Sequence, residues 1–570
     1  MSKKIGVYVC QCGSNISDVI DMEKTLDALA DIEGVHVLKQ TMFACADSAQ
    51  KEIAEDIREN ELEGLVVASC SPKLHVPTFR NVAKRAGLNP YQYVQVNIRE
   101  QGSWAHSDQP EPATEKAIQM IRAGITRVKL ARALDPIRID AENSVAVIGA
   151  GIAGMRAALG LAGLGTKVYL LERDHFVGGK VLLWGRLTDS ERTGKEIVDQ
   201  LYNELEKNNN VEILTGVEVE ALNGSIGDFT LNLNIKKKQQ QIHAGAIVLA
   251  SGFDPYRPQQ GEFGYKNHPS VITLDELKTE MNRNGGIESW NGRPVRQIAF
   301  IYCVGSCQVD GDNKYCSRIC CTTTLDTALQ LRKANPGIQC IHLYRQMRSY
   351  GKQELIYEEA CREGDLFLKF DDDDPPDVTI EDQDISITMR DQLTMGMELE
   401  IRPDLLVLVN GMVPSEGYER IAEIFKVPVG RDRFFNEVHP KLRPVETVID
   451  GIFIAGSCQG PKNIAESVKS GMSAVSKAHA LLREEEIELD PTIAYIDPAK
   501  CEWCDLCASV CPFDAIKKEQ YNGKMVAGVL SASCKGCGMC TPVCPEDAID
   551  LIGYTNEEIE GMIESIISSE

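Results

Sequence analysis

Two similar runs of cysteine near the end of the chain constrain its fold more than any other feature. Each has the spacing C-x2-C-x2-C-x3-C-P, the first from Cys501 to Pro512 and the second from Cys534 to Pro545. This spacing lets three thiolates of one loop surround a cuboidal iron–sulfur cluster, while the fourth thiolate comes from the other run. We therefore predict two [4Fe–4S] clusters. The expected ligands are Cys501, Cys504, Cys507 and Cys544 for one cluster, and Cys534, Cys537, Cys540 and Cys511 for the other.

The composition indicates redox chemistry in a reducing compartment. The 570 residues include 20 cysteines, no signal-like segment opens the chain, and no apolar run approaches the roughly 18 residues that span a bilayer. We therefore expect a cytoplasmic protein, in which thiols stay reduced and serve metals more often than disulfides. The formal charge of −24 argues against nucleic acid as a partner, because phosphate binding needs a basic surface.

A dinucleotide-binding signature spans residues 144–172. A short apolar run leads into Gly149-Ala150-Gly151-Ile152-Ala153-Gly154, which is followed by a helical pattern, a second apolar run and Glu172. The glycines permit a tight turn and the close approach of a pyrophosphate to the helix N-terminus. Glu172 is placed to accept the ribose hydroxyls. The complete strand–helix–strand context predicts a dinucleotide site.

The later motifs resemble those of flavoproteins with two dinucleotide-binding domains, such as thioredoxin reductase and the small subunit of glutamate synthase. They are Gly178-Gly179-Lys180, the run that ends at Ala250-Ser251-Gly252, and Ala455-Gly456 before a helical pattern. The resemblance implies FAD, with Ser457 standing where that family usually has Asp. The residues expected to bind it are Gly149, Ala150, Gly151, Ala153, Gly154, Glu172, Arg173, Gly179, Lys180, Ala250, Gly252, Gly456 and Ser457.

The position of a second nucleotide fingerprint is rich in thiols. The expected strand at 296–302 runs into Cys303-Val304-Gly305-Ser306-Cys307 with no glycine triad, and Tyr315-Cys316-Ser317-Arg318-Ile319-Cys320-Cys321 follows. This substitution argues against NAD(P)H at the second domain and favours another cluster there.

Over nearly its whole length the chain resembles the A subunit of heterodisulfide reductase, the FAD and iron–sulfur subunit of methanogens and its bacterial homologues. The two thiol-rich segments above carry the resemblance, with His342-Leu343-Tyr344-Arg345, Cys458-Gln459-Gly460-Pro461-Lys462 and Cys10-Gln11-Cys12-Gly13. It implies a [4Fe–4S] held by Cys303, Cys316, Cys320 and Cys321 near the flavin. Cys307 could replace one ligand, Cys458 lies beside the flavin turn, and a redox dithiol at Cys320-Cys321 is the alternative.

The resemblance also implies partners. These are B and C subunits in a multi-subunit complex that can dimerise, and soluble ferredoxin or a hydrogenase or formate dehydrogenase module that exchanges electrons with it. The chain departs from the family at two places. Residues 211–245 lack a cysteine-bearing insertion, and Asp326 stands where several members place a Lys close to the flavin. An acid there would oppose the reduced, anionic flavin and so argue against electron bifurcation.

The first 135 residues predict a small parallel α/β domain. Strand patterns at 4–9, 35–40, 64–69 and 93–98 alternate with helical patterns. Cys10, Cys12, Cys45 and Cys70 follow the ends of three strands, the edge where α/β sheets place ligands. We predict a further [4Fe–4S] there, with buried free thiols as the alternative.

The expected fold class is therefore α/β with a small α+β appendage. An N-terminal iron–sulfur domain (1–135) precedes a thioredoxin-reductase-like core, made of an FAD domain (136–257 and 434–490) and a second nucleotide fold (258–433). A two-cluster, bacterial-type ferredoxin domain (491–552) and a docking helix (553–570) follow. Three functions compete: electron bifurcation or confurcation within a complex, a non-bifurcating electron relay, and a free-standing NAD(P)H-dependent flavin reductase. No catalytic nucleophile constellation is present.

Overall fold

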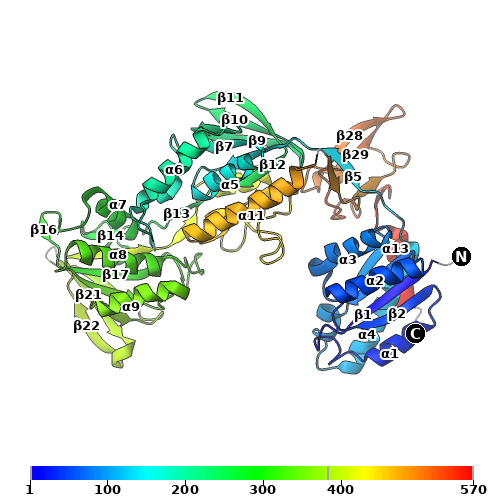
Figure 1. The fold of residues 1–570 in the computed structure, drawn as a ribbon, viewed down its shortest axis with the longest axis horizontal. Helices are drawn as coiled ribbons and strands as arrows, with labels where there is room; N and C mark the ends of the chain where they lie inside the picture. Colours follow the sequence, from blue (N-terminus) through cyan, green and yellow to red (C-terminus); the bar gives the residue numbers. More distant parts are fainter. Residues whose placement is uncertain (1–2, 189, 382–383, 485, 568–570) are drawn as a thin grey trace. The chain divides into compact units, whose positions relative to one another are not determined.

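The computed structural model describes residues 3–188, 190–381, 384–484 and 486–567. The chain forms two compact units (Figure 1), one containing residues 1–139 and 488–570 and the other residues 140–487. The first and last segments of the chain thus belong to one unit, a grouping that the sequence motifs did not indicate.

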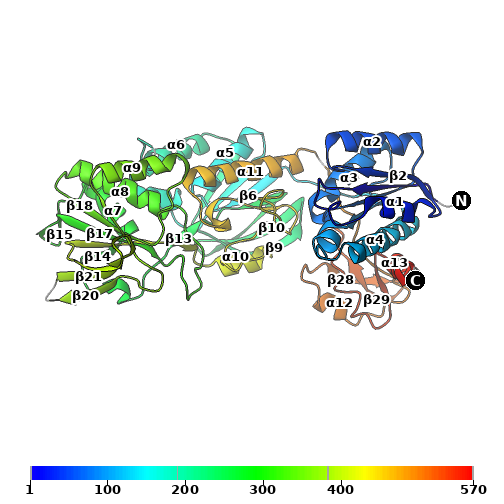
Figure 2. The same cartoon turned by 90° about the horizontal axis from the view of Figure 1, so that it is seen from below.

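The N-terminal part of the first unit is a parallel four-stranded sheet in the order β2-β1-β3-β4. Its elements are β1 (Ile5–Cys10), α1 (Met22–Ala30), β2 (Val35–Thr41), α2 (Asp47–Glu59), β3 (Gly64–Ser69), α3 (Pro72–Ala86), β4 (Tyr93–Asn97) and α4 (Pro110–Leu130). Helices α2 and α3 pack on one face, and α1 and α4 on the other (Figure 2). Because both faces are covered, the central strands β1 and β3 are buried at every residue.

The C-terminal part of the same unit consists of two antiparallel strand pairs around the cysteine runs. β27 (Ala494–Ile496) pairs with β30 (Ile549–Leu551), and β28 (Ile516–Tyr521) pairs with β29 (Lys524–Val529). The short helix α12 (Leu506–Ser509) lies inside the first run. The final helix, α13 (Asn556–Ile567), packs along α4 (Figure 2).

An arginine of α4 contacts the two residues Gly553 and Tyr554, which lie just before α13. Arg127 donates to the carbonyl of Gly553 over 2.8 Å, and its guanidinium lies 3.8 Å from the ring centroid of Tyr554. The predicted docking helix therefore docks on its own chain.

The second unit begins with a parallel sheet in the order β25-β12-β6-β7-β8. Its elements are β6 (Ser144–Ile148), α5 (Ile152–Gly163), β7 (Lys167–Glu172), α6 (Gly194–Glu206), β8 (Val211–Thr215), β12 (Ala246–Leu249), β25 (Ile452–Ile454) and α11 (Ile464–Leu482). α11 packs on α5. A side sheet of β9 (Val217–Ser225), β10 (Asp228–Ile235) and β11 (Lys238–Ala244) occupies the cysteine-free interval.

A second parallel sheet follows, in the order β14-β23-β17-β18-β19. Its elements are β14 (Val271–Thr273), α7 (Leu274–Asn284), β17 (Gln297–Val304), α8 (Cys320–Ala334), β18 (Gln339–Tyr344), α9 (Glu354–Arg362), β19 (Leu366–Lys369) and β23 (Leu405–Asn410). An antiparallel sheet of β20 (Asp377–Glu381), β21 (Asp384–Asp391) and β22 (Met397–Ile401) flanks it. The predicted fold class, two nucleotide-type folds with α/β and ferredoxin additions, is confirmed.

The remaining elements are short. They are β5 (Ile137–Asp140) paired with β26 (Glu486–Leu489), β13 (Phe253–Pro255) paired with β24 (Met412–Pro414), β15 (Ser289–Trp290) paired with β16 (Arg293–Pro294), and α10 (Tyr418–Phe425). Within the described ranges, no helix combines the length and the apolar character needed to cross a bilayer.

A fully buried polar network stiffens the second sheet. The His342 ring on β18 lies between Phe300 and Phe367, with ring centroids 5.2 and 4.7 Å away. Its Nδ1 pairs with the Tyr302 hydroxyl at 2.9 Å, and its Nε2 pairs with Asp365 at 3.2 Å. Because both ring nitrogens have partners, this buried histidine is structurally satisfied.

Candidate functional site

A cavity of about 680 Å³ opens in the second unit where β6, β7, β12 and β25 end. The carboxyl ends of parallel strands are where α/β folds bind their ligands. The size and position of the cavity therefore suit a dinucleotide.

The fingerprint glycines shape the cavity in three different ways. Gly149 has φ +104°, and a Cβ there would lie 2.5 Å from the Ala250 carbonyl oxygen. A Cβ on Gly154 would lie 1.9 Å from the Gly149 carbonyl oxygen, so this glycine lets α5 pack close to β6. A Cβ on Gly151 would meet no atom within 4 Å, which leaves open space in front of the N-terminus of α5. No side chain caps that terminus, so its N–H groups are available to a pyrophosphate.

The acid after β7 is held by the backbone. Glu172 lines the cavity, and its carboxylate accepts from the N–H of Ala150 at 2.7 Å and of Asp174 at 3.0 Å. Lys180, after the glycine pair, forms an ion pair with Asp254 at 2.7 Å. The Ser251 hydroxyl is buried in this wall without a described hydrogen-bond partner, and a bound ligand would satisfy it.

The turn after β25 closes the other side of the cavity. Gly456 has φ +74°, and a Cβ there would lie 2.7 Å from the Ala153 Cβ. Beyond it, Lys462 lines the cavity, and its ammonium donates to the Gln459 side-chain oxygen over 3.1 Å. Burial lowers the pKa of Lys462, with nearby Cys458 and Glu437 acting in the opposite direction. The Cys458 thiol is buried and donates to the carbonyls of Leu249 and Ala455, at 3.3 and 3.2 Å.

Most residues predicted to bind FAD line this one cavity. They are Gly149, Gly151, Ala153, Glu172, Arg173, Gly179, Lys180, Ala250, Gly252 and Ser457. Ala150, Gly154 and Gly456 are not among the lining residues. The wall also includes residues for which the sequence carried no recognisable signal: Val217–Val219 of β9, Ser415–Gly417, and Arg420 and Ile424 of α10.

Asp326 is not among the residues that line the cavity. Its carboxylate accepts from the Gln330 amide at 2.7 Å and lies near the buried Lys278 and near Arg186. Burial raises the pKa of Asp326, and the two cations oppose that change. Lys278 and Arg186 thus offset the charge of Asp326 only in part.

Five thiols gather at the end of β17 and after it, where a second nucleotide fold would hold a pyrophosphate. Cys303 and Cys307 adopt left-handed backbone conformations, with φ +61° and +52°. The Cys307 thiol hydrogen-bonds with those of Cys303 and Cys316, and this contact with Cys303, with burial, raises the pKa of Cys307 to about 11. Cys320 pairs with Cys321 at the start of α8 and lies near Cys303 and Cys316. All four predicted ligands are therefore brought together, and Cys307 lies among them.

Three arginines contact this group of thiols or its backbone. Arg345 donates to the Cys307 carbonyl over 2.7 Å, and its buried Nε has no described partner. Arg348 hydrogen-bonds to the Cys316 thiol, and the Arg318 N–H donates to the Cys316 sulfur at 3.2 Å. The Arg348 cation, which acts on Cys307, Cys316 and Cys321, suits an anionic thiolate-bound cluster.

The C-terminal runs enclose two small cavities. Cys501, Cys504, Cys507 and Cys544 line one, and Cys511, Cys534, Cys537 and Cys540 line the other. These are the two sets that the sequence assigns to separate clusters. Backbone N–H groups donate to the cysteine sulfurs in a repeated pattern: Ala515 to Cys511 at 3.4 Å and Ala548 to Cys544 at 3.3 Å. Hydrogen bonds of this kind tune the potential of a cluster.

The four N-terminal thiols also lie near one another. Cys10 interacts electrostatically with Cys12 and Cys45, and Cys70 with Cys12 and Cys10. Burial raises the pKa of Cys70 to about 11, and nearby Arg99 opposes the rise. Cys45 is exposed, so one side of the group faces solvent.

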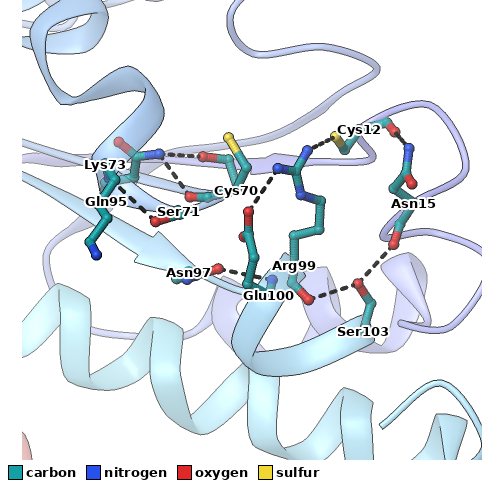
Figure 3. A network of polar contacts seen from close by, with 11 residues as sticks. Cys12, Asn15, Cys70, Ser71, Lys73, Gln95, Asn97, Arg99, Glu100 and Ser103 are labelled. Carbon is teal, nitrogen blue, oxygen red and sulfur yellow. Dashed lines mark hydrogen bonds and ion pairs between the residues drawn. The ribbon is translucent and has the colours of Figure 1, made fainter. Parts of the chain in front are cut away.

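A charged residue that the sequence analysis missed lies in this group. Figure 3 shows Arg99, just after β4, between Cys12 and Glu100, to which it is joined at 3.2 and 2.7 Å. Its guanidinium also stacks 4.5 Å from the Trp104 ring centroid, while its Nε is buried without a described partner. No motif links Arg99 to the cysteines, because parallel strands from distant parts of the sequence bring them together.

Comparison with known proteins adds two family matches. Residues 143–283 match the pyridine nucleotide-disulphide oxidoreductase family, and residues 492–551 match the 4Fe-4S dicluster domain. These matches establish a flavoprotein with FAD and [4Fe–4S] clusters. The first match ends before β17, where the thiol group begins.

Similar curated proteins cover almost the entire chain. It is 32% identical over 607 residues to one of the iron–sulfur A subunits of the CoB–CoM heterodisulfide reductase of Methanopyrus kandleri, covering 92% of both chains. It is 32% identical to the A subunit of the H(2):CoB-CoM heterodisulfide,ferredoxin reductase of Methanothermobacter marburgensis, covering 91% of each. It is 31% identical to the A subunit of the H(2)/formate:CoB-CoM heterodisulfide,ferredoxin reductase of Methanococcus maripaludis, covering 92% of each. Among solved structures, Lactococcus lactis thioredoxin reductase matches 59% of this chain and 98% of its own, with 19% identity and a TM-score of 0.42.

Proposed function

Because this chain belongs to the family of heterodisulfide reductase A subunits, we propose that it couples electron pairs to single electrons within a multi-subunit oxidoreductase. FAD can exchange electrons in pairs or one at a time, whereas [4Fe–4S] clusters pass them singly. The residues that line the cavity would hold the FAD. Clusters would be held at three places: by the two cysteine sets of the C-terminal runs, by four of the five thiols near the end of β17, and by the four N-terminal thiols.

One observation carries this proposal. The place where a two-nucleotide flavoprotein would bind NAD(P)H holds thiols instead, with α8 beginning at Cys320. The free backbone N–H groups at the N-terminus of α8 stabilise the thiolate form of a cysteine, as they would stabilise a bound phosphate. The same unit therefore offers a flavin cavity and a cluster site, and its second fold lacks the glycine fingerprint for a nicotinamide dinucleotide.

Mixing the purified chain with NADH or NADPH under anaerobic conditions tests the proposal. We expect no rapid bleaching of the flavin absorbance, whereas reduced ferredoxin should bleach it. Rapid stoichiometric bleaching by either nicotinamide would instead establish a free-standing NAD(P)H-dependent reductase.

Within this role we propose flavin-based bifurcation or confurcation. Two observations favour it over a simple relay: Lys462 places a cation in the cavity wall, and Asp326 lies outside that wall beside two cations. A redox titration of the bound FAD should give crossed one-electron potentials. Potentials in the normal order would identify a non-bifurcating relay.

The proposed partners are B and C subunits of a heterodisulfide-reductase-like complex, together with ferredoxin and a hydrogenase or formate dehydrogenase module, in the cytoplasm. The names of the relatives, which include hydrogen, formate and ferredoxin, support this set. Anaerobic purification of the tagged chain from its native cells should recover these subunits. A chain that purifies alone, with full flavin and iron content, would contradict the complex.

A further inference from the structure

One arginine joins the thiol loop of the second fold to the wall of the FAD cavity. Arg318 lies two residues after Cys316, with φ +63°. Its Nη1 donates to the Pro461 carbonyl over 3.1 Å, and its Nη2 forms an ion pair with Glu466 at 2.6 Å. The same Nη2 donates to the Tyr350 hydroxyl at 3.2 Å. The guanidinium thus contacts three residues in two segments of the unit, 346–350 and 461–466.

The segment on the cavity side is well anchored. The second carboxylate oxygen of Glu466 accepts from the Asn463 N–H at 3.0 Å, and the Asn463 side chain accepts from the Glu466 N–H at 2.8 Å. This reciprocal capping box fixes the first turn of α11. Lys462 and Ser467, next to the two residues that Arg318 contacts, line the cavity. The arginine therefore holds a rigid part of the wall.

The segment on the thiol side, residues 346–350, contacts the cysteines. Residues 346–350 follow β18, and the Cys321 thiol donates to the Gln346 carbonyl at 3.8 Å. Arg348 in the same segment contacts the Cys316 thiol. Through its hydrogen bond to Tyr350, the Arg318 guanidinium also restrains this segment.

We propose that Arg318 is a positioning residue that holds the thiol loop at a fixed separation from the FAD cavity. The proposal rests on the proposed function, because it assigns the thiol group to a cluster that exchanges electrons with FAD. Electron transfer between two centres slows steeply as they move apart, so loosening this contact would slow transfer without removing either centre. Charge-assisted contacts of this kind are strong enough to hold two surfaces together.

Hydrogen exchange of the full-length protein tests this role. In Arg318→Ala we expect amide exchange to rise about tenfold in both 316–321 and 461–466, since the loss of hydrogen bonds to a charged group opens both segments. Iron and FAD contents should stay at wild-type values, and flavin bleaching after cluster reduction by dithionite should slow in stopped flow. Unchanged exchange in 461–466, or an unchanged bleaching rate, would overturn the proposal.

Two further variants distinguish the loss of the Arg318 contact with 461–466 from the loss of a positive charge near the thiols and from misfolding of the thiol loop. Arg348→Ala removes a cation from the same thiols but has no described contact with α11, so exchange should rise near 316–321 and not in 461–466. Glu466→Gln keeps the capping hydrogen bond and removes the ion pair at a residue that has no described hydrogen bond to a cysteine, so it should reproduce the slower bleaching even if Arg318→Ala loses iron. A Glu466→Gln protein that behaves like wild type would refute the role of Arg318.

The outcome also distinguishes this inference from the proposed function. If iron analysis of the wild type leaves no cluster for the thiols after β17, the proposed function fails there. The coupled exchange of 316–321 and 461–466 would then still report the contact, now as a purely structural one, and the positioning role would be overturned.

Discussion

Arg99 Nη1 donates a hydrogen bond to the Cys12 sulfur over 3.2 Å, across 87 residues of sequence. The same guanidinium pairs with Glu100 and stacks on Trp104, so it is held in place and only 15% of its side chain is exposed. A fixed positive charge beside a thiolate ligand stabilises the more negative, reduced state of a cluster.

We therefore expect Arg99→Gln to lower the midpoint potential of the N-terminal cluster. Loss of one charge about 4–7 Å away, at an effective dielectric constant of about 20, changes the interaction energy by about 2–4 kcal/mol, which corresponds to a one-electron shift on the order of 100–200 mV. Titration monitored by electron paramagnetic resonance would measure it. Arg58→Gln, on the exposed face of α2, is the matched control and should shift nothing. Equal potentials in Arg99→Gln and wild type would contradict the expectation.

Crossed ligation in the C-terminal domain predicts a pattern of iron loss in double variants. Cys511 lies with Cys537 around one cavity, and Cys504 lies around the other. The pair Cys511→Ser and Cys537→Ser should cost about four irons per chain, while Cys511→Ser and Cys504→Ser should cost about eight, since each cluster needs four thiolates. Iron and sulfide analysis decides it. The reverse pattern would mean that each run binds its own cluster.

The cation in the cavity wall predicts a change in flavin potential. Lys462→Met removes a positive charge that favours the anionic reduced flavin, so the midpoint potential of bound FAD should fall by roughly 30–60 mV, equivalent to about 1.4–2.8 kcal/mol for two electrons. Spectral titration would follow it, with Lys469→Met, exposed on α11 seven residues further along the chain, as the control. Because Asp326 lies outside the wall, Asp326→Asn should have the smaller effect; a larger shift in that variant would place the key charge at Asp326 after all.

The buried imidazole of His342 predicts a pH dependence of stability. Burial lowers the pKa of His342, although Asp365 acts in the opposite direction. The folded chain therefore keeps this ring neutral below pH ~6.5, where the ring of the unfolded chain takes up a proton. The unfolded state then binds more protons. The contribution of His342 to the free energy of unfolding therefore falls by up to about 1.4 kcal/mol for each pH unit below ~6.5, and it is constant above that pH.

Hydrogen exchange of β18 in the full chain at pH 7.5 and 5.5, corrected for intrinsic exchange rates, measures that dependence. His342→Gln is less stable at both pH values but should lose this part of the slope. His439→Gln should keep it. A slope that survives in His342→Gln would have to come from the carboxylates of the same unit.

The sequence predicted those features that short motifs encode. The fingerprint from Gly149 to Gly154 and its flanking strands are local, as are the spacings from Cys501 to Cys511, so their chemistry follows from neighbouring residues. Arg99 reaches Cys12 only through a tertiary contact across 87 residues, which no local motif encodes. Asp326 shows the converse, because a position inferred by resemblance faces Lys278 in the fold and is not part of the cavity wall.

The packing of α13 on α4 has a consequence for how the protein is made. Residues 140–487 form a complete unit that interrupts the other one, so α4 leaves the ribosome long before the helix that covers it. The N-terminal sheet must wait, with the α13-binding side of α4 uncovered, while the entire flavoprotein core is translated. The packing of α13 on α4 must therefore follow the translation of residues 140–487, and it joins two parts of the chain that are made far apart in time.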